Sequence, residues 1–244
     1  NKMLFCKRST FFLRTLKGQN MKRLIILIST LLFLPFQIAN AQSGIAYYVE
    51  AENPAAFIQA LAVLNELPVT NIQTSVSIAV ANGSGAATHF VSVQGESLAD
   101  IDRLRQNQAT SPEFANFNSA IRGNATSVFE LVYTSLGVDN GKASVVTSPN
   151  AYHWHTHLLV TDVPAYLEAL EEIMETNSGG NVYTHAYQTT GTGLGGGNLV
   201  VVNSANSLEE LLSNNQGFDE FIEKTINIRT PIANGIYQTI TTWE

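Results

Sequence analysis

The sequence repeats itself, and this repetition limits what the chain can fold into more than any other feature. Short landmarks recur in the same order in both halves, 110 positions apart over most of the length and slightly closer near the end. A period this long is typical of duplicated domains, because solenoid repeats run to about 20–50 residues. The matching landmarks are Pro54-Ala55 with Pro164-Ala165, Ser97–Asp100 with Ser207–Glu210, Phe114 and Phe117 with Phe218 and Phe221, and Val128-Phe129 with Ile236-Tyr237.

Each copy is expected to contain a strand, a helix, two strands, a helix and a strand. In the first copy, the helix after Asn53-Pro54 has apolar residues at three- and four-residue steps. An Asn-Gly turn between two alternating segments predicts a hairpin. Ser97, with an acidic residue three positions later, predicts the start of the second helical region. The strands of this copy are predicted at 45–49, 76–81, 88–93 and 128–136.

A βαββαβ unit typically folds into a four-stranded antiparallel sheet with both helices on one face, the ferredoxin-like arrangement. The uncovered face of each sheet needs a partner, and the second copy can supply it. We therefore predict an α+β fold of two tandem ferredoxin-like domains, packed sheet against sheet as an intramolecular pseudo-dimer. The predicted boundaries are 42–136 for the first domain, 137–150 for the linker and 151–244 for the second domain.

On these features the chain resembles the dimeric α/β-barrel superfamily, in the branch that includes antibiotic-biosynthesis-monooxygenase-like domains. The resemblance rests on the proline-led first helix, the hairpin, the duplication and the segment Ser111-Pro112-Glu113-Phe114-x-x-Phe117. It covers essentially the whole chain after residue 41. Members of the superfamily include cofactor-free oxygenases, haem-binding enzymes and isomerase-like proteins. The resemblance therefore implies a small-molecule cavity between sheet and helices or between the domains, but no particular set of catalytic residues.

The first 41 residues have the pattern of a secretory signal peptide preceded by an extra segment. Met21-Lys22-Arg23 forms a basic start, residues 24–36 form an apolar run, and Ala39-Asn40-Ala41 is a small-x-small cleavage site. We expect residues 1–20 to be translated upstream sequence and residues 21–41 to be the signal peptide. The mature protein is thus predicted to be secreted, in the periplasm or outside the cell, without membrane insertion after cleavage.

The charge balance of the mature part argues against nucleic-acid and membrane-surface partners. The chain holds 13 basic and 20 acidic residues, and seven of the basic ones precede residue 42, which leaves 6 against 20 and a net charge of −14. Such a surface repels phosphate backbones and anionic lipid. The only cysteine, Cys6, also precedes residue 42, so the mature protein is expected to form no disulfide. We expect a pseudo-dimeric monomer, with a higher oligomer left open.

Three of the five histidines, His153, His155 and His157, alternate along one predicted strand. Side chains two positions apart share a face of a strand, so these rings would line one side of a sheet. Such a row can ligate a divalent metal ion if a neighbouring strand supplies a further ligand. The resemblance also raises haem, because some members use a histidine as the axial ligand. The alternative is an ordinary polar strand face. The candidate further ligands are His185, His89 and Glu50.

A second group of residues indicates a ligand-binding surface. Tyr183, His185 and Tyr187 alternate on another predicted strand, which would give one face with both acid–base groups and aromatic rings. Together with Tyr47 they are the predicted ligand-binding residues, suited to an aromatic or lipophilic small molecule. The glycine-rich run 191–197 has the residue pattern of a dinucleotide-binding fingerprint but not its structural context. It is predicted to join two strands, whereas the fingerprint joins a strand to a helix. It is predicted to be a hairpin loop.

These observations leave three hypotheses of function. The first is a secreted protein with a small-molecule cavity, either a binding protein or an oxygenase-like enzyme. The second is a metal- or haem-binding protein that uses His153, His155 and His157. The third is a non-catalytic interaction or structural module. We favour the first, without a cofactor, and keep a divalent metal or haem as the alternatives.

Overall fold

The computed structural model describes residues 42–65, 71–83, 85–190, 196–213 and 216–243. The predicted upstream segment and signal peptide therefore lie outside the described residues, as does most of the predicted glycine-rich loop. The described residues belong to one compact unit. Within them, no helix is both long enough and apolar enough to cross a membrane.

Strands form the centre of the fold, and each neighbouring pair of strands is antiparallel. All four strands predicted for the first copy are present, and the second of them begins at Ile72 rather than at Val76. The strands are β1 (Ser43–Ala51), β2 (Ile72–Ala81), β3 (His89–Gly95), β4 (Ala125–Asp139), β5 (Tyr152–Val160), β6 (Tyr183–Thr190), β7 (Leu199–Ala205) and β8 (Arg229–Trp243).

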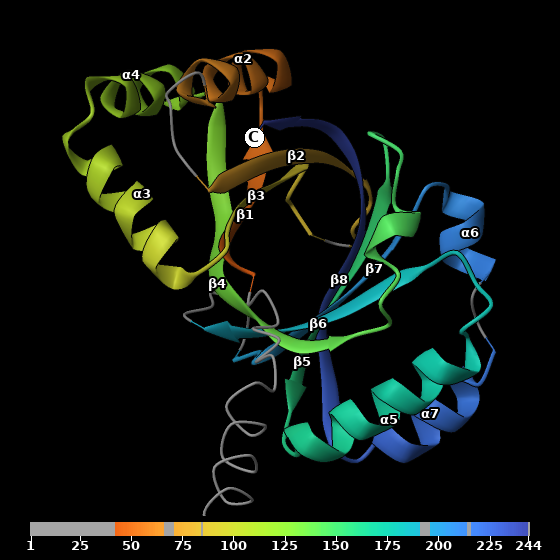
Figure 1. The fold of residues 1–244 in the computed structure, drawn as a ribbon. Helices are drawn as coiled ribbons and strands as arrows, with labels where there is room; N and C mark the ends of the chain where they lie inside the picture. Colours follow the sequence, from red (N-terminus) through yellow and green to blue (C-terminus); the bar gives the residue numbers. More distant parts are fainter. Residues whose placement is uncertain (1–41, 66–70, 84, 191–195, 214–215, 244) are drawn as a thin grey trace, which may run out of the picture. The chain divides into compact units, whose positions relative to one another are not determined.

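The strands close into a barrel, and Figure 1 looks into the ring that they form. The order around the barrel is β1-β3-β2-β8-β5-β7-β6-β4, with β4 beside β1 again. Within each half the order is the fourth, first, third and second strand of that half. The halves are joined by the pairing of β2 with β8 and of β4 with β6.

The closed barrel agrees with the barrel type that the resemblance implied, and it corrects only the expectation that the two sheets pack face to face. The half-sheets meet edge to edge through hydrogen bonds, as in the register that places Ser77 opposite Thr239. The physical reason is that an open sheet leaves a row of unpaired N–H and C=O groups along each edge strand, and only closure removes both edges. The inner faces of the two halves consequently surround an interior instead of forming a flat interface.

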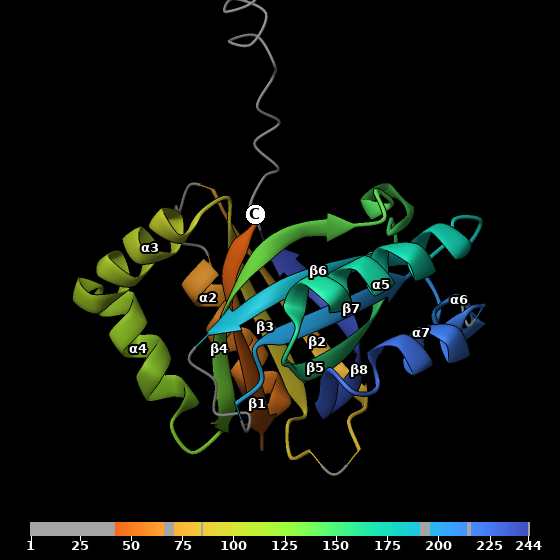
Figure 2. The same ribbon diagram turned by 90° about the horizontal axis from the view of Figure 1, so that it is seen from below.

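The described residues form six α-helices, which lie outside the barrel (Figure 2). One group packs on each half: α2 contacts α4, and α5 contacts α7. A short 3-10 helix, η1 (Ala143–Val145), lies between the halves in the sequence. The α-helices are α2 (Pro54–Asn65), α3 (Leu98–Thr110), α4 (Pro112–Ile121), α5 (Val163–Thr176), α6 (Leu208–Ser213) and α7 (Phe218–Thr225).

Local sequence signals start these helices where the repeat predicted them. The Ser97 hydroxyl accepts a hydrogen bond from the backbone N–H of Asp100, and the Asp100 carboxylate accepts one from the backbone N–H of Ser97. This capping box satisfies two N–H groups that would otherwise have no partner at the start of α3. At the matching place in the second half, the Ser207 hydroxyl accepts from the backbone N–H of Glu210 and begins α6.

The barrel wall is buried on both faces. Under the helices of the first half, Phe57 and Leu61 of α2 pack on Val49 and Val91 of the wall. Under the helices of the second half, Tyr166 and Leu170 belong to a cluster with Leu158 and Val201. A third cluster fills one part of the barrel interior; its buried members are Ala46, Tyr48, Ala87, Leu131, Tyr133 and Tyr237.

The segment between the halves is more ordered than a plain linker. β4 continues to Asp139, inside the range 137–150 that was predicted to connect the domains, and η1 follows it. The Lys142 ammonium group donates hydrogen bonds to the carbonyl oxygens of Ser178 and Gly180 at 2.5 Å each. This segment therefore belongs to the folded unit, while the domain boundary itself stays a prediction.

Candidate functional site

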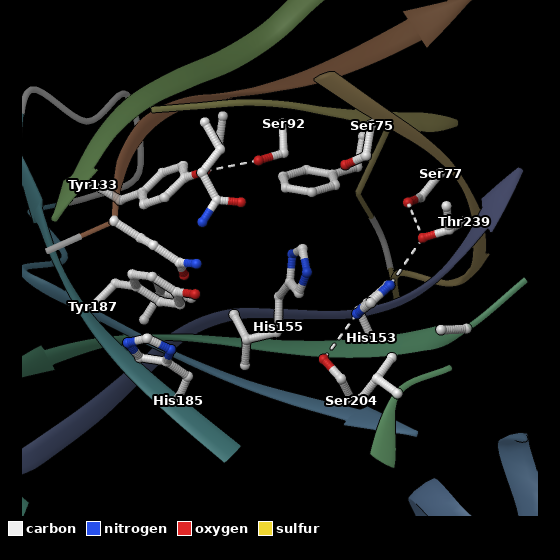
Figure 3. Close-up of a pocket in the computed structure, with 18 of the residues that line it drawn as sticks. Ser75, Ser77, Ser92, Tyr133, His153, His155, His185, Tyr187, Ser204 and Thr239 are labelled. Atoms are coloured by element: carbon white, nitrogen blue, oxygen red, sulfur yellow. Dashed lines mark hydrogen bonds between the residues drawn. The ribbon is translucent and has the colours of Figure 1, made fainter. Parts of the chain in front are cut away.

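A cavity of about 380 Å³ lies inside the barrel and is lined by strands of both halves (Figure 3). Its wall combines histidine and tyrosine rings with small hydroxyl side chains and apolar residues such as Phe90 and Leu131. None of the described residues that line it is a lysine, an arginine, an aspartate or a glutamate. The histidines and tyrosines of the wall are Tyr48, Tyr133, His153, His155, His157, Tyr183, His185 and Tyr187.

The three alternating histidines of β5 all line this cavity. β5 lies between β7 and β8, and backbone hydrogen bonds along both of its edges fix the direction of its inward-pointing side chains. His155 and His157 are each only 4% exposed. His185 enters from β6, the strand beyond β7, where it lies opposite Val202. Closure of the barrel thus brings four of the five histidines of the chain to one interior.

Two of these histidines are saturated by hydroxyl groups. Nδ1 of His153 lies 2.8 Å from Oγ of Ser204, and its Nε2 lies 2.9 Å from Oγ1 of Thr239. In the same way, Nδ1 of His185 lies 2.7 Å from the Tyr183 hydroxyl and its Nε2 lies 2.7 Å from Oγ of Ser135. Both nitrogens of each ring are therefore engaged, and these rings serve to shape the wall.

The other two histidines share one tyrosine. The Tyr48 hydroxyl lies 2.9 Å from Nδ1 of His155 and 2.8 Å from Nε2 of His157. The remaining ring nitrogens, Nε2 of His155 and Nδ1 of His157, make no hydrogen bond to the described residues. Every fully buried side-chain nitrogen or oxygen among those residues has a hydrogen-bond partner. Since these two nitrogens have none, they are not fully buried and border open space. Figure 3 shows the His155 ring standing in the cavity.

The metal hypothesis receives no support from this arrangement. Among the described residues there is no group of three or more histidine, cysteine, aspartate or glutamate side chains placed to hold one ion. His153, His155 and His157 point the same way, but hydroxyl groups take four of their six ring nitrogens. The predicted further ligands do not complete a site: Glu50 is exposed, and Nδ1 of His89 pairs with Thr88.

Burial keeps the cavity neutral near neutral pH. It lowers the pKa of His153 and of His157 from 6.5 to about 4, and it lowers the pKa of His155 well below 6.5, with His157 and His153 as weaker causes. Burial also raises the pKa of the Tyr133 and Tyr183 hydroxyls to about 12. The cost of placing a charge away from water is the common cause. The wall therefore offers neutral donors and acceptors rather than ions.

Aromatic rings pack against one another in one part of the cavity wall. The rings of His185 and Tyr187 stack with their centroids 4.1 Å apart at an interplanar angle of 14°. Tyr133 meets Tyr187 edge-on at 5.2 Å, and its hydroxyl lies 2.7 Å from Oγ of Ser92. Aromatic rings in the wall suit a ligand with an aromatic frame, because aromatic rings prefer offset-stacked or edge-to-face contacts with one another.

Comparison with known structures identifies this architecture. A candidate monooxygenase from Fusobacterium nucleatum subsp. nucleatum superposes with a TM-score of 0.56 at 11% identity, over 83% of this chain and 93% of that one. An anthrone oxidase-like protein gives 0.56 at 10% identity, over 83% and 92%. A mutant chlorite dismutase from Candidatus Nitrospira defluvii gives 0.54 at 11% identity, over 82% and 92%. The chain has the dimeric α/β-barrel fold. No protein-family model and no curated protein sequence matches it.

In this dimeric α/β-barrel, the predicted ligand-binding residues do not all meet. Tyr183, His185 and Tyr187 line the interior cavity, whereas Tyr47 lies on the outer face of β1. There it borders a separate pocket of about 300 Å³ under α2, α3 and α4, together with Arg105. The aromatic residue of β1 that lines the interior is its neighbour Tyr48, which sequence reasoning missed. Both faces of β1 are buried, so the alternation of its side chains does not reveal which face is inside.

Haem, the cofactor that the dimeric α/β-barrel resemblance raised, does not fit these residues. Its two propionate groups are carboxylates, which proteins normally pair with arginine or lysine. Among the described residues, those that line the interior cavity offer histidine nitrogens but no cationic side chain. The described lining of the pocket of about 310 Å³ under α5 and α7 includes Arg229 but no histidine. Neither pocket therefore combines an imidazole ligand with a partner for the propionates.

The segment between the halves of the barrel closes part of the cavity. Ala143, Val146, Ser148 and Pro149 belong to its wall. Asn206, at the end of β7, holds this segment: its Oδ1 accepts from the backbone N–H groups of Thr147 and Ser148 at 2.9 and 2.8 Å. Its Nδ2 donates to the carbonyl oxygen of Val145 at 2.5 Å.

We expect the variant Asn206→Ala to release this part of the wall. Three hydrogen bonds are lost, and at roughly 0.5–1.5 kcal/mol each the stability should fall by about 1.5–4.5 kcal/mol. Amide hydrogen exchange should accelerate most at Ser148, whose N–H loses its acceptor, and less at Thr147, whose N–H keeps the carbonyl oxygen of Val145 at 3.1 Å. The control Asn206→Asp keeps that acceptor and should keep the two amides protected. Unchanged exchange in the alanine variant would mean that Asn206 does not hold the segment.

Proposed function

We propose that the barrel interior binds a small uncharged molecule with an aromatic or apolar frame and hydrogen-bonding groups. The observation that carries this proposal is the wall: four histidines and four tyrosines around about 380 Å³, with no charged side chain among the described lining residues. Small-molecule sites in proteins typically enclose about 300–1,000 Å³. A charged ligand would lose its hydration there without an opposite charge to compensate for the loss.

Two kinds of contact would hold such a ligand. The aromatic rings of His185 and Tyr187, which line the cavity, offer contacts to an aromatic frame. The free nitrogens of His155 and His157 offer hydrogen bonds to its polar groups. His155 would therefore contact the ligand, while His153 and His185 would support the wall through their hydroxyl partners. A filled interior would have favoured a purely structural module, and the size of the cavity favours binding instead.

A second proposal is that the bound molecule is oxidised by O₂ in the manner of a cofactor-free oxygenase. Two observations favour it: the fold is shared with proteins described as a candidate monooxygenase and as anthrone oxidase-like, and a free ring nitrogen of His155 borders the cavity. A neutral imidazole can take a proton from a carbon acid. When a CH₂ group beside an aromatic ketone becomes C=O, one O₂ is consumed and one H₂O is released, so the electrons balance without a further reductant.

Binding is tested with two ligands that share a frame. We expect 2-naphthol to bind the secreted protein at least about tenfold more tightly than 2-naphthoate at pH 7.5, which corresponds to about 1.4 kcal/mol. The reason is that the naphthoate must bury a charge. Isothermal titration calorimetry measures both. His155→Phe should weaken binding strongly by removing the polar anchor, and Tyr47→Phe, outside the cavity, should leave it intact. Equal affinity for the carboxylate would contradict the proposal.

Oxidation is tested separately with an oxygen electrode. With anthrone as the probe, we expect protein-dependent O₂ uptake of one molecule per molecule oxidised, lost in His155→Phe and kept in Tyr47→Phe. Binding without any O₂ uptake would reject the enzyme and leave a binding protein.

We also propose that the natural form is the secreted chain that begins at Gln42, built as an intramolecular pseudo-dimer of two tandem ferredoxin-like units. The start of β1 at Ser43, just after the proposed cut, supports the cleavage site. The same element order in both halves supports the duplication. N-terminal sequencing of the protein recovered from the periplasm or the culture medium tests the first point, because any other first residue would contradict it.

A further inference from the structure

The shared tyrosine imposes a proton count on the two histidines beside it. The Tyr48 hydroxyl is within hydrogen-bond distance of Nδ1 of His155 and of Nε2 of His157. All three side chains are almost completely buried, Tyr48 at 2% exposure and each ring at 4%. Burial also lowers the pKa of both histidines, so each ring is neutral and carries one proton on one of its two nitrogens.

A phenol has a single proton to donate, so Tyr48 donates to one ring and accepts from the other. If it donates to Nδ1 of His155, then Nε2 of His157 must be protonated, and both rings are Nε2–H tautomers. If it donates to Nε2 of His157, then Nδ1 of His155 must be protonated, and both rings are Nδ1–H tautomers. A mixed pair would leave either two lone pairs facing one proton or a buried phenolic proton without an acceptor, and both arrangements are unfavourable.

We infer that Tyr48 holds His155 and His157 in the same tautomer, so that the cavity always presents one donor and one acceptor whose positions exchange together. In one arrangement, Nε2–H of His155 donates into the cavity and Nδ1 of His157 accepts. In the other, Nε2 of His155 accepts and Nδ1–H of His157 donates. Tyr48 is thus a positioning residue, which acts on the ligand through the two rings that it joins.

This pairing narrows the ligand class of the proposed function, on which this step rests. A ligand with one carbonyl and one hydroxyl group matches a donor and an acceptor at the same time. It also matches both arrangements, because the ligand can reverse its orientation so that its carbonyl faces the donating ring and its hydroxyl faces the accepting ring. A molecule with only one such group leaves one ring nitrogen without a partner. The geometry therefore favours an uncharged hydroxyketone over a simple phenol or a simple ketone.

The tautomers are measured in the ligand-free protein. Long-range ¹H–¹⁵N correlation spectra of the ¹⁵N-histidine-labelled chain at pH 7.5 distinguish Nδ1–H from Nε2–H rings. We expect the same pattern for His155 and His157, and we expect Tyr48→Phe to uncouple them. The matched control is Tyr133→Phe, which removes another phenol from the same wall, one bonded to Ser92 and to no histidine. It should leave the pattern unchanged.

Opposite tautomers in the wild-type spectrum would overturn the inference, as would an unchanged pattern in Tyr48→Phe. Because the first outcome needs only the wild-type protein, the inference stays testable if Tyr48→Phe does not fold.

The ligand class is tested with three uncharged probes: 4-hydroxyacetophenone, 4-methylacetophenone and 4-ethylphenol. We expect the hydroxyketone to bind about tenfold more tightly than either probe with one polar group. That advantage should disappear in Tyr48→Phe and persist in Tyr47→Phe, a variant outside the cavity. Equal binding of all three would overturn the ligand class and leave the proposed function standing. If none of them binds and 2-naphthol does not bind either, the proposed function fails, while the spectra still decide whether the tautomers are coupled.

Discussion

Acidification from pH 7.5 to pH 4.5 should remove on the order of 5 kcal/mol of stability from this protein. His153 and His157 have an ordinary pKa of 6.5, which burial lowers to about 4 in the fold. Below pH 6.5 the unfolded chain takes up protons at these positions, whereas the folded chain does not. Each histidine then removes about 1.4 kcal/mol per pH unit, and its effect ends near pH 4, where the folded state is protonated as well. His155 adds to the loss in the same direction.

The measurement is urea unfolding at a series of pH values between 7.5 and 4. A total of 5 kcal/mol is comparable to the whole stability of many domains, so the wild-type protein should unfold near the acidic end. His153→Gln removes one titrating ring and keeps groups that can hydrogen-bond to Ser204 and Thr239. The slope of its unfolding free energy against pH should therefore be smaller than that of the wild type by the contribution of about one proton. A stability that is constant from pH 6.5 to 4.5 would contradict the burial of neutral histidines.

Replacement of Gly44 by alanine should destabilise the protein and displace Tyr133 from the cavity wall. Gly44 lies opposite Tyr133 in the pairing of β1 with β4, and the Tyr133 side chain lies across it. An added Cβ would overlap Oη and Cζ of Tyr133 and would lie 2.5 Å from the carbonyl oxygen of Val93. Neither the tyrosine, which is 8% exposed, nor the backbone of β3 has room to move. We expect a loss of about 3 kcal/mol or more, at the upper end for overpacked cores, and loss of 2-naphthol binding.

Chemical denaturation and calorimetry of Gly44→Ala test this expectation. The control is Gly179→Ala, at an exposed position where an added Cβ would meet no atom within 4 Å. It should match the wild-type protein in stability and in binding. If Gly44→Ala is as stable as the control, then Tyr133 does not depend on the glycine for its place in the wall.

Much of the secondary structure could be predicted, because its signals are local. The capping pair of Ser97 and Asp100 and the proline in the first turn of α5 act within one turn of helix, so they can be read from adjacent residues. The strand ends were less predictable: β4 runs from Ala125 to Asp139, beyond the predicted range of 128–136. Its extra residues are ordered partly by pairing with β6, which the sequence of β4 alone does not reveal.

The candidate site, too, could be predicted from the sequence only in part. The alternation of His153, His155 and His157 predicted correctly that they share a face, because side-chain direction in a strand has a period of two. It did not predict what they meet. Their hydrogen-bond partner Tyr48 lies 107 positions from His155 and 109 from His157. The sequence predicts Tyr47 instead as a ligand-binding residue, because β1 is apolar on both faces and its alternation does not distinguish inside from outside.

The duplicated order of strands and helices, and the face that the histidines of β5 share, follow from the amino-acid sequence alone. Those properties depend on contacts within a few residues and on the alternation of side chains along a strand. Only the tertiary structure decided that the half-sheets join through β2 with β8 and β4 with β6, and that Tyr48 meets His155 and His157 in a neutral interior. These features depend on hydrogen bonds between distant segments, and they exist only once the barrel has closed.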